Sequence, residues 1–140
     1  MYPNRQMNKS LQVLVMNGKY VFRKIIQEEI PSMFSLVLKR IVWMDENNIR
    51  QWNVTNYAEA YPENYYYEQY ENGNVFVLEE EKTGEIVCAA ILQETDKRWN
   101  DNVPSIYLHN FVSKVGVKSA GTIFLELCRK ICCYAGKAIL

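Results

Sequence analysis

Apolar residues recur along this chain with two different periods, and these periods predict strands and helices. Short apolar runs bounded by polar residues or glycine have the length and residue types of β-strands. One longer stretch repeats apolar residues every three or four positions, which predicts a helix with a single buried face. The predicted strands are 19–26, 74–78, 85–92 and 105–112, and the helix face comprises Ile30, Met33, Phe34, Val37, Leu38, Ile41 and Met44.

The ends of the helices are marked by residues with known terminal preferences. Residues 27–31, with the sequence QEEIP, open the long helix, because acidic residues and proline both suit a first turn. Asn47 and Asn48 are expected to end it, and Pro62 to begin a short second helix. A last helix is predicted from about Ser119 to Ala135, where Gly136 would serve as a C-cap.

The remaining segments complete the order of elements. Charged residues and glycine at 80–84 join two of the predicted strands, so these strands form a hairpin with a longer loop. Residues 11–16 fit a short additional strand, and residues 137–140 resemble the opening of a final one. We therefore interpret residues 1–18 as an N-terminal extension and 19–140 as one domain.

Residues 50–73 are unusually rich in aromatic side chains. Tyr66 and Tyr70 lie four positions apart and would line one side of the short second helix. Such residues pack their rings and leave their hydroxyls in water, so a purely structural role is one interpretation. The other is a wall of a substrate site, and the sequence leaves both open.

Composition narrows the classes of function. With 140 residues, 49% of them apolar, the chain supports one domain with a sizeable core. Its 16 basic and 16 acidic residues cancel, which removes the electrostatic basis for non-specific nucleic-acid binding. No stretch approaches the roughly 20 apolar residues of a membrane span, and no signal peptide is recognisable. The expectation is a cytoplasmic protein with neither nucleic acid nor membrane as a partner.

The cysteines and the histidine do not suggest a metal site. Cys128, Cys132 and Cys133 crowd the last predicted helix, Cys88 is distant in sequence, and no C-x-x-C pair occurs. A zinc site needs three or four converging ligands, and the single histidine, His109, lies elsewhere. We expect no metal, and buried free thiols in a reducing compartment.

The segment from strand 105–112 into the last helix carries the strongest functional signal. A loop bearing Gly116 and Gly121 leads into a helix N-terminus, whose unpaired N–H groups and dipole favour a phosphate or pyrophosphate. A nucleotide-hydrolysing P-loop is not indicated, because Thr122 and Ile123 follow Gly121 where lysine and serine or threonine are required. The dinucleotide fingerprint G-x-G-x-x-G is also absent.

The segment Lys118-Ser-Ala-Gly121-Thr-Ile123 resembles the pyrophosphate-binding motif of the GNAT N-acetyltransferase superfamily. That motif is Gln/Arg-x-x-Gly-x-Gly/Ala after the fourth strand; here lysine replaces the first residue, the central glycine is kept, and isoleucine replaces the last. Residues 105–112 resemble the fourth strand, and 43–53 the end of the first helix and its loop. The resemblance spans about residues 19–140 and implies an α/β (α+β) fold with a mainly antiparallel sheet flanked by helices.

This resemblance implies acetyl transfer from acetyl-CoA, as co-substrate, to the amine of a small molecule or peptide. In the family, a distortion of the fourth strand turns backbone N–H groups toward the thioester, which maps here to Phe111 and Val112. Two general bases are candidates, His109 and Glu94, and strand alternation would place His109 on the same face as Phe111. The pyrophosphate would be bound by the main chain of Lys118, Ser119, Ala120, Gly121, Thr122 and Ile123.

The resemblance also carries a departure. Family members continue through a fifth strand, a further helix bearing a catalytic tyrosine, and two more strands, whereas this sequence ends near the start of the fifth strand. The domain is therefore expected to be incomplete at its C-terminus. The alternative function is a catalytically inactive protein that binds CoA weakly or acts as an interaction module. Uncovered apolar surface would favour a homo-oligomer.

Overall fold

The computed structural model describes residues 13–94, 105–134 and 138–139. Within them the strands form one sheet whose spatial order follows the sequence, and neighbours are antiparallel except β5 and β6, which pair in parallel. This arrangement confirms the predicted mainly antiparallel, mixed fold. The strands are β1 (Val13–Met16), β2 (Tyr20–Lys24), β3 (Val75–Glu80), β4 (Ile86–Gln93), β5 (Ser105–Ser113) and β6 (Ala138–Ile139).

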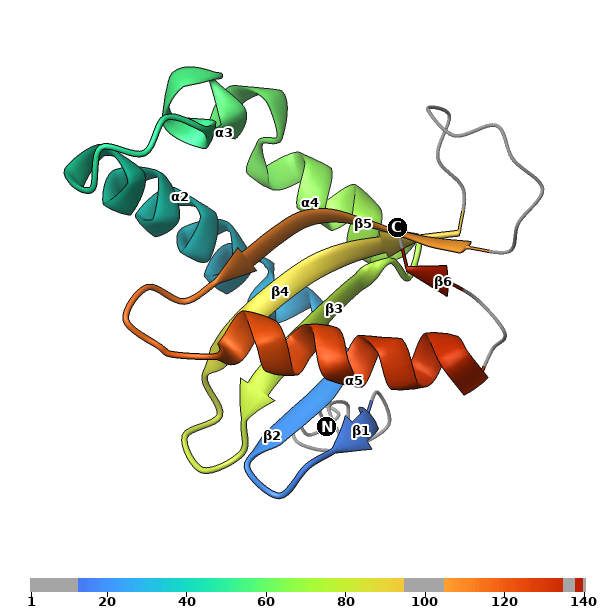
Figure 1. Ribbon diagram of the computed structural model, residues 1–140. Coiled ribbons are helices and arrows are strands. Elements are labelled where there is room, and N and C mark those ends of the chain that lie inside the picture. The colour runs from blue at the N-terminus through green and yellow to red at the C-terminus, as the bar shows by residue number, and fades with distance from the viewer. Residues whose placement is uncertain (1–12, 95–104, 135–137, 140) are drawn as a thin grey trace, which may run out of the picture.

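Helices cover both faces of this sheet (Figure 1). One face carries α5 alone, while α2, α3 and α4 lie on the other side. The long insertion between β2 and β3 supplies every helix of the second face. The helical elements are η1 (Gln27–Glu29), α2 (Ile30–Glu46), η2 (Trp52–Val54), α3 (Tyr57–Ala60), α4 (Glu63–Glu71) and α5 (Ala120–Tyr134).

The predicted helix ends agree with the structure. Asn47 follows α2 as its C-cap residue, and Pro62 precedes α4 as its N-cap residue. The hairpin of β3 and β4 and the short first strand are also confirmed, and β1 pairs with β2, so residues 13–16 of the predicted extension belong to the sheet. The C-cap proposed at Gly136 lies outside the described residues.

One residue of the predicted α2 face was wrong. Leu38 is 41% exposed, whereas Leu36, which the pattern had left out, is 7% exposed and packs in the core. The buried stripe is centred on Ile30, Met33 and Val37, and its covered flank extends toward position 36. A 3.6-residue period alone does not say toward which side such a stripe widens.

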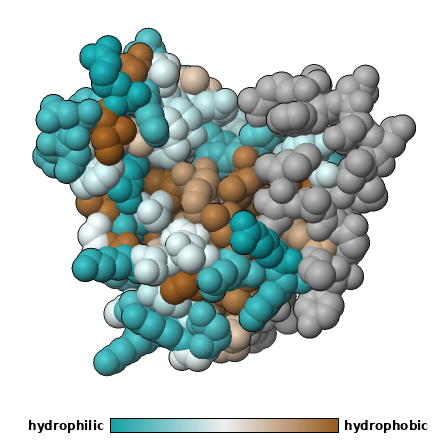
Figure 2. All heavy atoms as spheres, viewed as in Figure 1, coloured by the Kyte–Doolittle hydropathy of each residue, from teal (hydrophilic) through white to brown (hydrophobic). Residues whose placement is uncertain are grey.

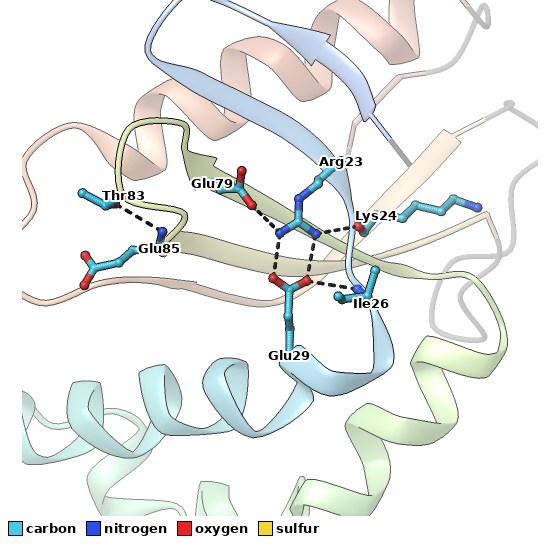
Figure 3. Close-up of polar contacts among 7 residues, drawn as sticks. All are labelled: Arg23, Lys24, Ile26, Glu29, Glu79, Thr83 and Glu85. Atoms are coloured by element: carbon cyan, nitrogen blue, oxygen red, sulfur yellow. Dashed lines mark hydrogen bonds and ion pairs between the residues drawn. The ribbon is translucent and has the colours of Figure 1, made fainter. Parts of the chain in front are cut away.

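A buried ion cluster ties β2 to η1 and β3 (Figure 3). The guanidinium of Arg23, which is fully buried, donates to both carboxylate oxygens of Glu29 at 2.8 and 2.7 Å and to Glu79 at 2.8 Å. Burial alone would lower the pKa of Arg23, but hydrogen bonds and charge from the two carboxylates raise it above the ordinary value. The start of the helical insertion is therefore fixed to the sheet.

Candidate functional site

The turn from β5 into α5 has the geometry of an anion-binding helix start. Gly116 and Ser119 both have left-handed φ angles, 87° and 67°, which turn the chain sharply before the helix. The amide of Ile123 donates to the carbonyl of Ser119 at 3.0 Å, so the amides before it have no acceptor within the helix. Lys118, Ser119 and Thr122 are exposed around this start. A phosphate group would find backbone donors and a positive side chain here.

Gly121 lies against the side chain of Phe111, a contact that the sequence did not reveal. An added Cβ would lie 3.2 Å from Cζ and 3.5 Å from Cε1 of Phe111. The glycine therefore permits close packing of α5 on β5, rather than only the approach of a ligand. Ile123, at the last motif position, is half-buried and packs against the α5 side of the core.

The predicted distortion of the fourth family strand is present as a β-bulge in β5. Ala89 of β4 pairs with Val112 and Ile91 pairs with His109, so two residues of β5 oppose the single residue Ala90. Asn110 lies in this bulge with a left-handed φ of 53°. A bulge interrupts the ladder and re-aims its residues, which is the geometry needed to direct backbone groups toward a ligand.

The bulge also overturns the expectation that His109 and Phe111 share a face. The ring of Phe111 lies 5.5 Å from that of Phe124, so it packs toward α5. His109 pairs directly with Ile91, which packs in the core beneath α2 and α4, so His109 is directed to the opposite face. Strand alternation failed here because the bulge inserts one extra residue between the two positions.

Of the two candidate bases, His109 lies beside the bulge and Glu94 does not. His109 directly precedes Asn110 and is half-buried. Glu94 is exposed just beyond the end of β4, three residues after the partner of His109 and about 10 Å farther along the strand. The structure therefore brings one candidate, not both, to the distorted strand.

Sequence analysis missed the groups that hold the bulge from the helical face. The side-chain amide of Asn110 donates to the hydroxyl of Tyr57 at 2.6 Å, and the hydroxyl of Tyr65 donates to Asn110 Oδ1 at 3.0 Å. Three residues further along, Arg40 of α2 donates to the carbonyl and the hydroxyl of Ser113 at 2.8 and 3.1 Å. Asparagine within an apolar strand, where it is disfavoured, was the available signal.

The two tyrosines belong to a continuous series of aromatic contacts. Trp52 stacks on Tyr57 with ring centroids 4.2 Å apart, and tilted contacts at 4.9 Å link Tyr57 to Tyr61 and Tyr61 to Tyr65. Burial is the main cause that raises the pKa of Tyr57 and of Tyr65 to about 12 each, so both hydroxyls stay protonated at neutral pH. The aromatic segment therefore packs beside the bulge and contacts it through two hydroxyls.

Hydrophobic residues gather in the middle of the face shown in Figure 2, between α5 and the helices of the opposite side. Leu108 and Phe111 of β5 are half-buried and contribute apolar surface on the α5 side. β6 pairs with β5 only at Ser105 and Ile106, so within the described residues β5 has no strand on its outer side at the bulge. A ligand with an extended, flexible chain would have access to the outer edge of β5 at the bulge.

Among residues 13–94, 105–134 and 138–139, no three histidine, cysteine or acidic side chains converge as a metal site would require. No helix within the described part of the chain is both long and apolar enough to cross a membrane.

Comparison with solved structures decides which fold this is. A GNAT-family acetyltransferase from Listeria monocytogenes superposes with a TM-score of 0.68 over 88% of this chain and 76% of its own, at 16% identity. One from Streptococcus agalactiae gives 0.67 over 84% and 72%, at 18% identity. The chain has the GNAT fold.

The PaiA N-acetyltransferase of Thermoplasma acidophilum, solved in complex with coenzyme A, shows the same GNAT architecture. It superposes with a TM-score of 0.61 over 86% of this chain and 75% of its own, at 13% identity. No protein-family profile and no curated protein sequence matches the chain. The similarity is therefore one of fold, which sequence comparison alone does not detect.

Proposed function

We propose that this protein binds acetyl-CoA at the turn between β5 and α5 and transfers its acetyl group to an amine. The observation that carries the proposal is the combination of a bulged β5 with a helix start that offers unpaired amides, in a chain with the GNAT fold. A GNAT neighbour with coenzyme A and another with acetyl-CoA have been solved, which supports a cofactor of this class.

The proposed contacts divide between two parts of the site. The main chain from Lys118 through Ser119, Ala120, Gly121 and Thr122 to Ile123 would hold the pyrophosphate, with the helix dipole favouring its charge. The backbone at Phe111 and Val112 would polarise the thioester carbonyl, which is the role of an oxyanion hole. The half-buried apolar surface of Leu108 and Phe111 would contact the uncharged arm of the cofactor.

Acetyl transfer needs few further groups. The amine nitrogen attacks the thioester carbon, the carbon–sulfur bond breaks, the amine loses a proton, and the thiolate of CoA gains one. His109 is the proposed base because it adjoins the bulge and because a neutral imidazole nitrogen can accept a proton. Glu94 remains the second candidate, acting through water because of its separation along β4.

A binding measurement tests the cofactor site. Lys118→Glu reverses an exposed charge beside the helix start and should weaken acetyl-CoA binding about fivefold to tenfold in calorimetry. Lys39→Glu makes the same charge change at an exposed position on α2 and is the matched control. Absence of any heat or thermal stabilisation with millimolar acetyl-CoA in the unmodified protein would contradict the proposal.

The same preparation then separates an enzyme from a binding protein. Release of CoA in the presence of a panel of amines would establish transfer, and His109→Gln should lower its rate about a hundredfold. An unchanged rate would move the role of base to Glu94 or to water. Binding without turnover of any amine would favour the alternative of a catalytically inactive protein that binds CoA.

A further inference from the structure

The bulge residue Asn110 has a backbone conformation that most residues adopt poorly. Its φ of 53° lies in the left-handed region, which asparagine tolerates better than β-branched or bulky residues do. It occupies the middle of β5, directly before the apolar residues Phe111 and Val112. Neither β-propensity nor core packing accounts for an asparagine at this position.

Its side chain is engaged on both of its polar atoms. Nδ2 donates to the Tyr57 hydroxyl and Oδ1 accepts from the Tyr65 hydroxyl, at 2.6 and 3.0 Å. The two tyrosines come from different helices, α3 and α4, and their rings are linked through Tyr61. The amide orientation is therefore fixed from two directions.

We propose that Asn110 is the positioning residue of the bulge, and that Tyr57 and Tyr65 set, through its amide, how the β5 backbone is presented to an acyl thioester. This inference rests on the proposed function, because it assigns a cause to the geometry of that site. It makes the hydroxyls of Tyr57 and Tyr65 part of the thioester-binding machinery without requiring that their rings touch the cofactor.

A second side chain from the helical face holds the other end of the segment that begins at Asn110. Arg40 holds the carbonyl of Ser113, so residues 110–113 are fixed at both ends by side chains from the helical face. Phe111 and Val112, the residues proposed to face the thioester, lie between the two fixed points. The high pKa values of both tyrosines mean that this arrangement persists throughout the neutral range.

The test compares two ligands that use different parts of the site. Acetyl-CoA reaches both the bulge and the helix start, whereas its nucleotide half, 3′-phosphoadenosine 5′-diphosphate, would reach only the helix start. Tyr57→Phe and Tyr65→Phe each remove one hydroxyl and keep the ring, and each should weaken acetyl-CoA binding about threefold to tenfold. Affinity for the nucleotide half should stay unchanged.

Two further variants make the comparison specific. Tyr61→Phe removes a hydroxyl from the same series of rings, and because Asn110 bonds Tyr57 and Tyr65 instead, it should leave both affinities unchanged. Asn110→Gly keeps access to the left-handed conformation but removes the amide, and should weaken acetyl-CoA binding at least as much as either tyrosine variant. Wild-type affinity in Asn110→Gly would overturn the inference.

Amide hydrogen exchange gives a readout that does not depend on the cofactor. Exchange at Phe111 and Val112 should rise about threefold to tenfold in Tyr57→Phe and Tyr65→Phe, and not in Tyr61→Phe. If exchange responds in this way but the unmodified protein binds no acetyl-CoA, the proposed function fails and the positioning role stands. If acetyl-CoA binds but all three tyrosine variants behave alike, or if both ligands weaken equally, the positioning role is wrong.

Discussion

The two faces of the sheet are held by different kinds of contact. On the α5 face, Phe124 is fully buried, its ring centroid lies 5.1 Å from that of Phe22, and the surrounding cluster is apolar. On the face covered by α2 to α4, apolar packing is joined by polar contacts between segments distant in sequence: Arg23 with Glu79, the Asn110 amide with its two tyrosines, and Arg40 with Ser113. The first face supplies burial, and the second also fixes orientation.

The apolar face therefore contributes mainly to stability, whereas the face with polar contacts also determines the geometry of the sheet. Apolar contacts are tolerant of direction, whereas a hydrogen bond or ion pair holds its partners in one arrangement. The side of the sheet with directional contacts is the side from which the bulge is held. The two faces should therefore respond differently to substitution.

The largest effect is expected on the apolar face. Phe124→Ala removes a fully buried ring and should lower the free energy of unfolding by about 4 kcal/mol, measured by urea denaturation. Glu126→Ala, at an exposed position on the same helix, is the control and should change it by less than about 0.5 kcal/mol. Comparable losses from the two variants would mean that α5 is not held by its buried face.

A somewhat smaller effect is expected from the buried ions. Glu29→Gln removes one charge of the Arg23 cluster and leaves the buried guanidinium with a single carboxylate, which should cost about 3 kcal/mol. Glu28→Gln, one residue earlier and exposed, makes the same chemical change and should be nearly neutral. If denaturation gave equal stability for both variants, the cluster would contribute little beyond apolar packing.

The smallest effect should come from alkaline pH. Tyr57 and Tyr65 have folded pKa values of about 12, above the ordinary value of 10.0, so their neutral forms are favoured in the folded state. The stability they contribute is therefore complete below pH 10 and lost as pH rises from about 10 toward 12. Denaturation at pH 9 and 11 should show a smaller alkaline loss for Tyr57→Phe/Tyr65→Phe than for the unmodified protein. An equal loss would mean that ionisation of Tyr57 and Tyr65 does not cause the alkaline loss of stability.

The sequence predicted those parts of the fold that depend on local patterns. The ends of α2 and α4, the hairpin of β3 and β4 and the start of α5 follow from caps, periodicity and turn residues near each element. Each of these signals is carried by residues close together in the chain. The GNAT fold was expected instead from a family resemblance in the 118–123 motif and in the order of elements over residues 19–140.

The contacts that shape the candidate site were not predictable in this way. Tyr57 and Tyr65 lie 53 and 45 positions from Asn110, so no local period relates them. The shared face of His109 and Phe111 was wrong because alternation assumes an uninterrupted ladder. The role predicted for Gly121 was incomplete because the sequence does not reveal that the ring of Phe111 lies against it.

The buried cysteines have a consequence for a protein that would handle an acyl thioester. Burial raises the pKa of Cys88 and of Cys128 to about 12 each, so both thiols are protonated at neutral pH. The thiolate is the form that exchanges with a thioester. Because the fold keeps both sulfurs protonated and buried, neither is suited to attack a thioester.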